Sequence, residues 1–379
     1  MLSARGWVAR ALVVGTVGAL AICRAAPSCD AMNWYDLDQY AAAQSLLDTG
    51  TMTGADGTPY VLWPPLYPVA VAMLAWTGLS VPHAALLLNA LLFVALCAAF
   101  SSWMEATGAS SRLRLLGSVG LVTPTLVSAG SRPRSEMLFL CLVVISLASL
   151  QRFIRGGNTR DLHITLLATA CAVSTRYVGV LLVATVAASL VRHAVGPVAK
   201  ARAALTAALC VVPLAAWAVR NEVIAGTLGG QRGRPVLGLP WVTENVGTAA
   251  VSVFNWVFPI TLVPRGVCVA FLFVVLVWFA RSQRVASDVE GDVRAVPAVF
   301  ATFYFVGYFM IASVVQIGLM DDRMVLPLLP AALWMHIVAI DALARSRSPR
   351  GCIAIEMAGF AFVPLALIRI ARMSLHGGS

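Results

Sequence analysis

Long apolar stretches alternate with short polar connections along nearly the whole chain. They show no alternation of apolar and polar positions, which indicates membrane helices rather than membrane strands. Their length suits the roughly 30 Å hydrocarbon core of a bilayer. We therefore predict an all-α polytopic membrane protein, with residues 1–379 as a single transmembrane domain. Its eleven predicted spans cover residues 7–23, 84–103, 114–130, 135–151, 163–175, 177–191, 203–219, 264–280, 296–316, 324–343 and 352–370.

One further apolar stretch, Pro65 to Gly78, is short and opens with prolines. If it crossed the membrane, the arginines after the following helices would fall on alternating sides. If it is an interfacial helix at the outer surface, every inner connection is basic, as the positive-inside rule requires. This topology predicts a cytoplasmic N-terminus, an outer loop with its interfacial segment at 24–80, and a second outer loop at 220–262.

Composition supports a membrane protein and limits its partners. Hydrophobic residues make up 60% of the chain and charged residues 12%, and the mean hydropathy is +0.85. A soluble domain has too little interior to bury that much apolar sequence. The net charge of +10 comes from arginines spread between apolar stretches, which indicates topology signals and contact with membrane lipids, not a nucleic acid partner. Cys23 and Cys29 flank the start of the outer loop and would suit a disulfide.

The first outer loop is acidic, and between Cys29 and Pro68 it contains no lysine or arginine. Asp36, Tyr40 and Gln44 are spaced by four residues, so they would share one face of a short helix. A carboxylate presented there can remove a proton from an acceptor hydroxyl as a general base.

Not every aspartate of this loop suits that role. Asp36 and Asp38 neighbour aromatic residues, and for them we favour a catalytic function. For Asp48 and Asp56 we favour solvated surface carboxylates. The same helix is predicted to end at Gly50.

Charged residues also lie at the predicted outer ends of later helices, at 131–136, 175–177 and 321–323. A guanidinium group offers paired donors to phosphate oxygens, so the arginines of these segments are candidates to bind a phosphate. Other interpretations stay open: snorkelling at the headgroups for Arg134, an interfacial turn for Arg176, and helix capping by Asp321 or Asp322. The five histidines are dispersed, without the spacing of metal ligands.

The order of these segments resembles the polytopic glycosyltransferases of the C superfamily, in particular their protein mannosyltransferase and aminoarabinose transferase branch. Asp36, Tyr40 and Gly50 match the first part of the family's outer-loop pattern, and Trp-Pro-Pro-Leu-Tyr-Pro at 63–68 matches the second. The later segments 132–136, 175–179 and 321–330 resemble the family's outer-boundary segments in the same order, so the resemblance covers residues 30–330.

This resemblance implies a sugar donor linked to polyprenyl phosphate and an active site on the extracytoplasmic face of the cell membrane. It also implies one outer-loop aspartate as the base for transfer with inversion. By position that residue is Asp36, with Asp38 the nearest competitor and Asp30 a third candidate. The residues expected to contact substrate are Asp30, Tyr40, Tyr67, Arg132, Glu136, Arg176, Tyr177 and Arg323.

The acceptor is expected to be a lipid, a glycan or a protein. No metal site is predicted, although loop carboxylates can bind a divalent ion or act without one, so the cofactor is left open. Two other functions remain alternatives: a transporter or flippase of lipid-linked saccharides, and a non-catalytic subunit of a cell-envelope assembly complex. A transporter should have polar residues near mid-membrane and often a repeated half. This chain concentrates its charges at one face, which favours the enzyme.

Overall fold

The structure is a computed structural model that describes residues 4–26, 32–230, 238–257, 263–270, 288–312, 322–345, 348–360 and 363–375. Within these ranges the regular elements are helices, apart from one isolated antiparallel bridge between Thr53 and Pro59. This confirms the predicted all-α fold. Cys29, Asp30 and Asp321 lie outside the described residues, and so do the predicted disulfide and the cap at Asp321.

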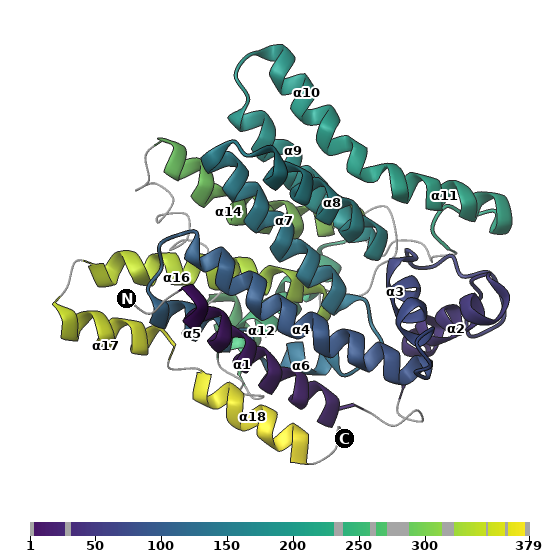
Figure 1. Ribbon diagram of the computed structural model, residues 1–379, viewed down its shortest axis with the longest axis horizontal. Coiled ribbons are helices and arrows are strands. Elements are labelled where there is room, and N and C mark those ends of the chain that lie inside the picture. Colours follow the sequence, from purple (N-terminus) through teal and green to yellow (C-terminus); the bar gives the residue numbers. More distant parts are fainter. Residues whose placement is uncertain are drawn as a thin grey trace.

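The described elements follow one another along the chain, with 3₁₀ turns marked η (Figure 1). They are α1 (Ala4–Arg24), α2 (Trp34–Thr49), α3 (Leu66–Ala75), α4 (Val81–Glu105), α5 (Ser111–Gly120), α6 (Pro124–Gly130), α7 (Glu136–Gly156), α8 (Thr159–Thr175), η2 (Tyr177–Gly179), α9 (Val180–His193), α10 (Pro197–Ala208), η3 (Leu209–Val211), α11 (Val212–Ala225), α12 (Leu239–Val257), α14 (Asp288–Ala312), α15 (Asp322–Val325), η4 (Leu326–Leu328), α16 (Leu329–Arg345), α17 (Pro349–Gly359) and α18 (Val363–Leu375).

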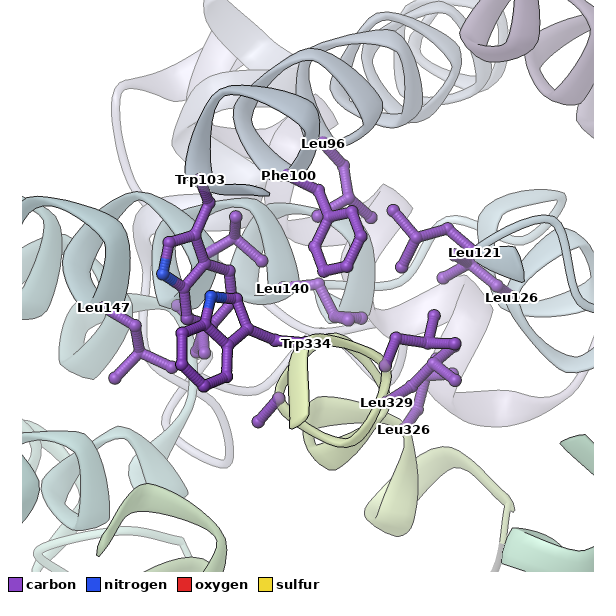
Figure 2. Packing of buried hydrophobic residues seen from close by; sticks show 14 of the residues in the cluster. Leu96, Phe100, Trp103, Leu121, Leu126, Leu140, Leu147, Leu326, Leu329 and Trp334 are labelled. Atoms are coloured by element: carbon purple, nitrogen blue, oxygen red, sulfur yellow. The ribbon is translucent and has the colours of Figure 1, made fainter. Parts of the chain in front are cut away.

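Helices α4 and α7 form the centre of the bundle. Helix α4 packs against α1, α3 and α7, and α7 packs in turn against α8 and α14. Figure 2 shows the core between α4, α7 and α16, where Trp103 stacks on Trp334 with ring centroids 5.8 Å apart. Phe100 meets Trp103 edge to face at 6.0 Å. Helices α10 and α11 lie at the edge of the bundle in Figure 1.

Five described helices are long and apolar enough to cross a membrane, or up to six if the bent pair α5–α6 counts as one span. They are Val81–Glu105, Glu136–Gly156, Pro197–Ala225, Ala295–Ala312 and Asp322–Ala344. Each coincides with one predicted span. The total of eleven stays a prediction, and residues 271–280 of the predicted span 264–280 lie outside the described part of the chain.

Two predicted spans are broken. Residues 114–130 form α5 and α6, which are bent by 60°. Thr123 accepts a hydrogen bond from the N–H of Leu126 at 3.2 Å and so starts a new helix, while Pro124 has no N–H to continue the old one. Residues 352–370 belong to α17, which ends at Gly359, and to α18, whose first turn contains Pro364.

The predicted division between 163–175 and 177–191 is confirmed. Helix α8 ends at Thr175, and Arg176 has an extended backbone with φ −146° and ψ 137°. The chain then re-enters a helix through η2 and α9. The range 220–262 includes the end of α11 and the whole of α12.

The segment 24–80, predicted to be the first outer loop, contains two helices. Helix α2 opens with a capping box between Asn33 and Asp36 and ends at Gly50, whose φ is +71°, as predicted. Helix α3 has 10 residues and is therefore about 15 Å long, too short to cross a bilayer. It packs on α2 and α4. Its place at the membrane interface stays a prediction.

Candidate functional site

A buried carboxylate in the first turn of α2 is held by two arginines from the segment before α7. Asp36 has no solvent-exposed surface. Its Oδ2 accepts a hydrogen bond from Nη1 of Arg132 at 2.8 Å, and its Oδ1 accepts one from Nε of Arg134 at 2.6 Å. Nη2 of Arg134 and the backbone N–H of Asn33 also point to Oδ2, at 3.4 and 3.3 Å. Both carboxylate oxygens are therefore engaged by protein donors, most of them cationic.

A second ion pair lies at the start of α7. Glu136 is buried, and its Oε1 accepts from Nη1 of Arg176 at 2.9 Å. Arg134 and Arg323 lie close enough to interact with the Glu136 charge, so Arg134 faces both carboxylates. The second oxygen, Oε2, is buried and has no hydrogen-bond partner among the described residues.

These charged side chains come from four separate segments: α2, the residues around the start of α7, the break between α8 and α9, and α15. We call them the arginine–carboxylate cluster, which consists of Asp36, Arg132, Arg134, Glu136, Arg176 and Arg323. Each guanidinium group carries a positive charge, so a site with several of them repels a cationic ligand and attracts an anionic one. Among the described residues, no three His, Cys, Asp or Glu side chains are placed to hold a metal ion.

Asp38 faces a different part of the loop, because two residues along a helix correspond to a turn of about 200°. Its Oδ1 accepts a hydrogen bond from the N–H of Ala55 at 3.1 Å. Burial raises the pKa of Asp38, the Ala55 bond lowers it, and the nearby Asp56 raises it further. Asp38 therefore ties α2 to the turn that follows it, away from the arginines.

This contact explains why a glycine stands at position 54. A Cβ atom at Gly54 would collide with Oδ1 of Asp38. We expect Gly54→Ala to destabilise the chain by about 1–3 kcal/mol, because the loop or the carboxylate has to shift. Thermal unfolding in detergent measures the effect. Gly156→Ala is the control, since a Cβ there has open space, and an equal loss in both variants would contradict the explanation.

The three tyrosines that are predicted to contact substrate make contacts with other protein groups. Tyr67 is buried and its hydroxyl donates to Oδ1 of Asn89 at 3.3 Å. The hydroxyl of Tyr177 donates to the carbonyl of Val61 at 3.1 Å. Tyr40 is partly buried and packs against the apolar cluster between α3 and α4. Their role as substrate contacts stays a prediction, as does that of Asp30, which lies outside the described residues.

Three polar side chains outside the predicted site residues hold the predicted outer loop and its surroundings. Arg220 donates from Nη1 to the carbonyl of Tyr60 at 2.8 Å, and Asn221 from Nδ2 to that of Val61 at 3.2 Å. Asn89 binds the segment that carries Arg132. A signal existed for Asn89 in particular, since a lone amide inside an apolar span points to a function or a specific partner.

No protein-family model matches the chain, and no curated protein matches its sequence. Among solved structures, ArnT from Cupriavidus metallidurans bound to undecaprenyl phosphate matches with a TM-score of 0.62 at 15% identity, over 95% of this chain and 64% of that one. Its apo state matches with a TM-score of 0.63 over 95% and 63%. The Archaeoglobus fulgidus oligosaccharyltransferase, in complex with Zn and sulfate, matches with a TM-score of 0.53 at 10% identity, over 96% and 53%.

The chain thus spans less than two thirds of the length of these neighbours. Nearly all of this chain is matched by both proteins, although so few residues are identical. ArnT and the oligosaccharyltransferase both have the fold of the C-type glycosyltransferases. The resemblance seen in the sequence is confirmed for the fold: this chain has the polytopic membrane fold of the glycosyltransferase C superfamily.

Proposed function

We propose that this chain is an integral-membrane glycosyltransferase that moves a sugar from a polyprenyl-phosphate-linked donor to an acceptor hydroxyl on the extracytoplasmic face. The observation that carries the proposal is the carboxylate of Asp36 held between Arg132 and Arg134. This arrangement brings a base and phosphate-binding groups to one place. The undecaprenyl phosphate bound to ArnT supports a donor of this class.

The arginines bind and stabilise the leaving group. When the bond between the anomeric carbon and the phosphate oxygen breaks, its electron pair stays with the polyprenyl phosphate. Guanidinium donors already in place at the developing charge lower the barrier without reorganisation. Arg132 and Arg134 offer such donors, and Arg132 is the more exposed of the two, with 25% of its side chain accessible.

Asp36 acts as the general base. The acceptor oxygen attacks the anomeric carbon from the face opposite the phosphate, so the configuration inverts, and the hydroxyl proton passes to the carboxylate. Without donor, the hydrogen bonds from the two arginines occupy both oxygens of Asp36. A donor phosphate competes for the same guanidinium groups and thereby frees an oxygen of Asp36 to accept the proton. Donor binding and activation of the base are thus coupled.

Glu136 contributes to recognition of the sugar. Its Oε1 is fixed by Arg176, whereas Oε2 is a buried acceptor with no protein donor among the described residues. A buried acceptor without a donor is unfavourable, and a sugar hydroxyl would satisfy it. The proposal therefore places a hydroxyl of the donor sugar near the start of α7.

Reconstitution into liposomes tests this function. The purified chain is supplied with polyprenyl-phosphate-linked sugars and with lipid, glycan and peptide acceptors, and products are detected by mass spectrometry. We expect a glycosylated acceptor and free polyprenyl phosphate in equal amounts. Movement of the donor between leaflets without a glycosylated product would favour the transporter. Neither product nor movement with any donor would favour a non-catalytic subunit.

The same preparation tests the topology. A cysteine introduced beside Asp56, at the tip of the first outer loop, should react with a membrane-impermeant reagent applied from the extracytoplasmic side of cells. Labelling from the cytoplasmic side alone would place the arginine–carboxylate cluster on the wrong face for this proposal.

A further inference from the structure

A buried asparagine of α4 forms hydrogen bonds to the backbone of the segment that carries Arg132 and Arg134. Nδ2 of Asn89 donates to the carbonyl of Gly130 at 3.0 Å and to the carbonyl of Arg132 at 2.7 Å. Its Oδ1 accepts from the hydroxyl of Tyr67 at 3.3 Å. The residue has no solvent-exposed surface. One amide therefore joins α3, α4 and the connection between α6 and α7.

The chemistry of the partners fixes the orientation of this amide. Carbonyl oxygens only accept, so both of them require the NH₂ group of Asn89. The tyrosine hydroxyl is left to donate to the amide oxygen. A flipped amide would set an oxygen against two carbonyls, and a leucine of similar size would provide no donor to either.

The Arg132 carbonyl is also part of the turn that orients the side chains of Arg132 and Arg134. It accepts a second hydrogen bond, from the N–H of Arg134 at 2.8 Å. Pro133, between the two, restricts the backbone further because its φ is fixed by the ring. Asn89 thus holds the carbonyl around which the segment turns, and both guanidinium groups then reach Asp36.

We infer that Asn89 is a positioning residue that fixes the Arg132–Arg134 turn and, through it, the place where the donor phosphate binds. This inference rests on the proposed function for its kinetic consequence, but not for its structural one. Asn89 touches neither the sugar nor the phosphate. It acts by holding backbone carbonyls, so that the two guanidinium groups are already in place before the donor arrives.

The test replaces Asn89 by leucine, which removes both donors at similar volume. We expect the KM for the polyprenyl-linked donor, and the Kd for undecaprenyl phosphate alone, to rise at least tenfold, with a smaller change in kcat. Amide hydrogen exchange measured by mass spectrometry should accelerate in peptides that cover residues 130–135. Tyr67→Phe removes only the third hydrogen bond, and should shift all three quantities in the same direction by less.

A matched control comes from the other end of the contact between α4 and α7. Gln151 is buried and accepts a hydrogen bond from Nε1 of Trp103. Gln151→Leu also removes a buried amide, so it should lower the melting temperature. Because it lies far along α7 from the arginines, it should leave the donor KM and the exchange at 130–135 unchanged.

The arms of the experiment separate two kinds of failure. Unchanged donor affinity and unchanged exchange at 130–135 in Asn89→Leu would overturn the role of Asn89. If wild-type protein neither transfers sugar nor binds undecaprenyl phosphate, the proposed function fails, while the exchange measurement still decides whether Asn89 orders the turn. If Asn89→Leu does not fold, Tyr67→Phe provides the same comparison, and an unchanged donor KM and unchanged exchange in that variant would overturn the inference.

Discussion

Asp36→Asn is expected to lower sugar transfer by a factor of about 100 or more, the scale on which removal of a general base acts. The asparagine has nearly the same shape, but its amide cannot take the acceptor's proton. The neutral amide also competes less well than a carboxylate with the donor phosphate for Arg132 and Arg134. Donor affinity should therefore stay the same or increase while kcat falls. Rates and undecaprenyl phosphate binding are measured on the same reconstituted protein.

The matched variant is Asp38→Asn, on the same helix two residues away. Its side-chain oxygen can still accept from the N–H of Ala55, so the turn after α2 keeps its support. We expect less than a tenfold loss of transfer. Full activity in Asp36→Asn would exclude Asp36 as the base. Equal losses of transfer and of donor binding in that variant would instead indicate a purely structural carboxylate.

The difference between these two aspartates shows what the sequence could and could not provide. Helix periodicity places Asp36 and Asp38 on opposite sides of α2, and that much follows from their spacing. The spacing does not show which of the two sides faces the bundle, because that depends on contacts with Arg132 and Arg134, which lie 96 and 98 residues further along the chain. Sequence reasoning identified a polar cluster at helix ends without the pairings inside it.

Among the helices, too, some features could be predicted from the sequence and others could not. Spans such as α4 and α7 were predictable because hydrophobicity over 20 or so residues dictates burial in lipid. The break between α5 and α6 was missed, although Thr123 and Pro124 carry a local signal for a new helix start. Hydrophobicity averaged over the whole apolar stretch hides such a local signal. The tyrosines show a further limit: an aromatic side chain with a hydroxyl suits a ligand and a protein acceptor equally well, so their role as substrate contacts stays a prediction.

The ion pair between Glu136 and Arg176 gives the largest expected effect on stability. Both side chains are largely inaccessible, with 5% and 9% of their surfaces exposed, and Nη1 and Oε1 are 2.9 Å apart. Glu136→Gln would remove the buried anion that Arg176 contacts, and Arg134 and Arg323 would lose the same anion. Removal of one partner from a buried pair costs about 3–5 kcal/mol. We expect a correspondingly lower melting temperature in detergent.

Two comparisons separate this effect from the general cost of a lost ion pair. Glu244 and Arg265 are only 2.7 Å apart but much more exposed, at 40% and 61% of their side chains, so Glu244→Gln should cost less than about 1 kcal/mol. The double variant Glu136→Gln with Arg176→Gln should be more stable than the two single losses added together, because both members of the buried pair are then neutral. If Glu136→Gln and Glu244→Gln lower the melting temperature equally, solvent reaches the pair, and the proposed burial of the sugar-binding acceptor on Glu136 fails with it.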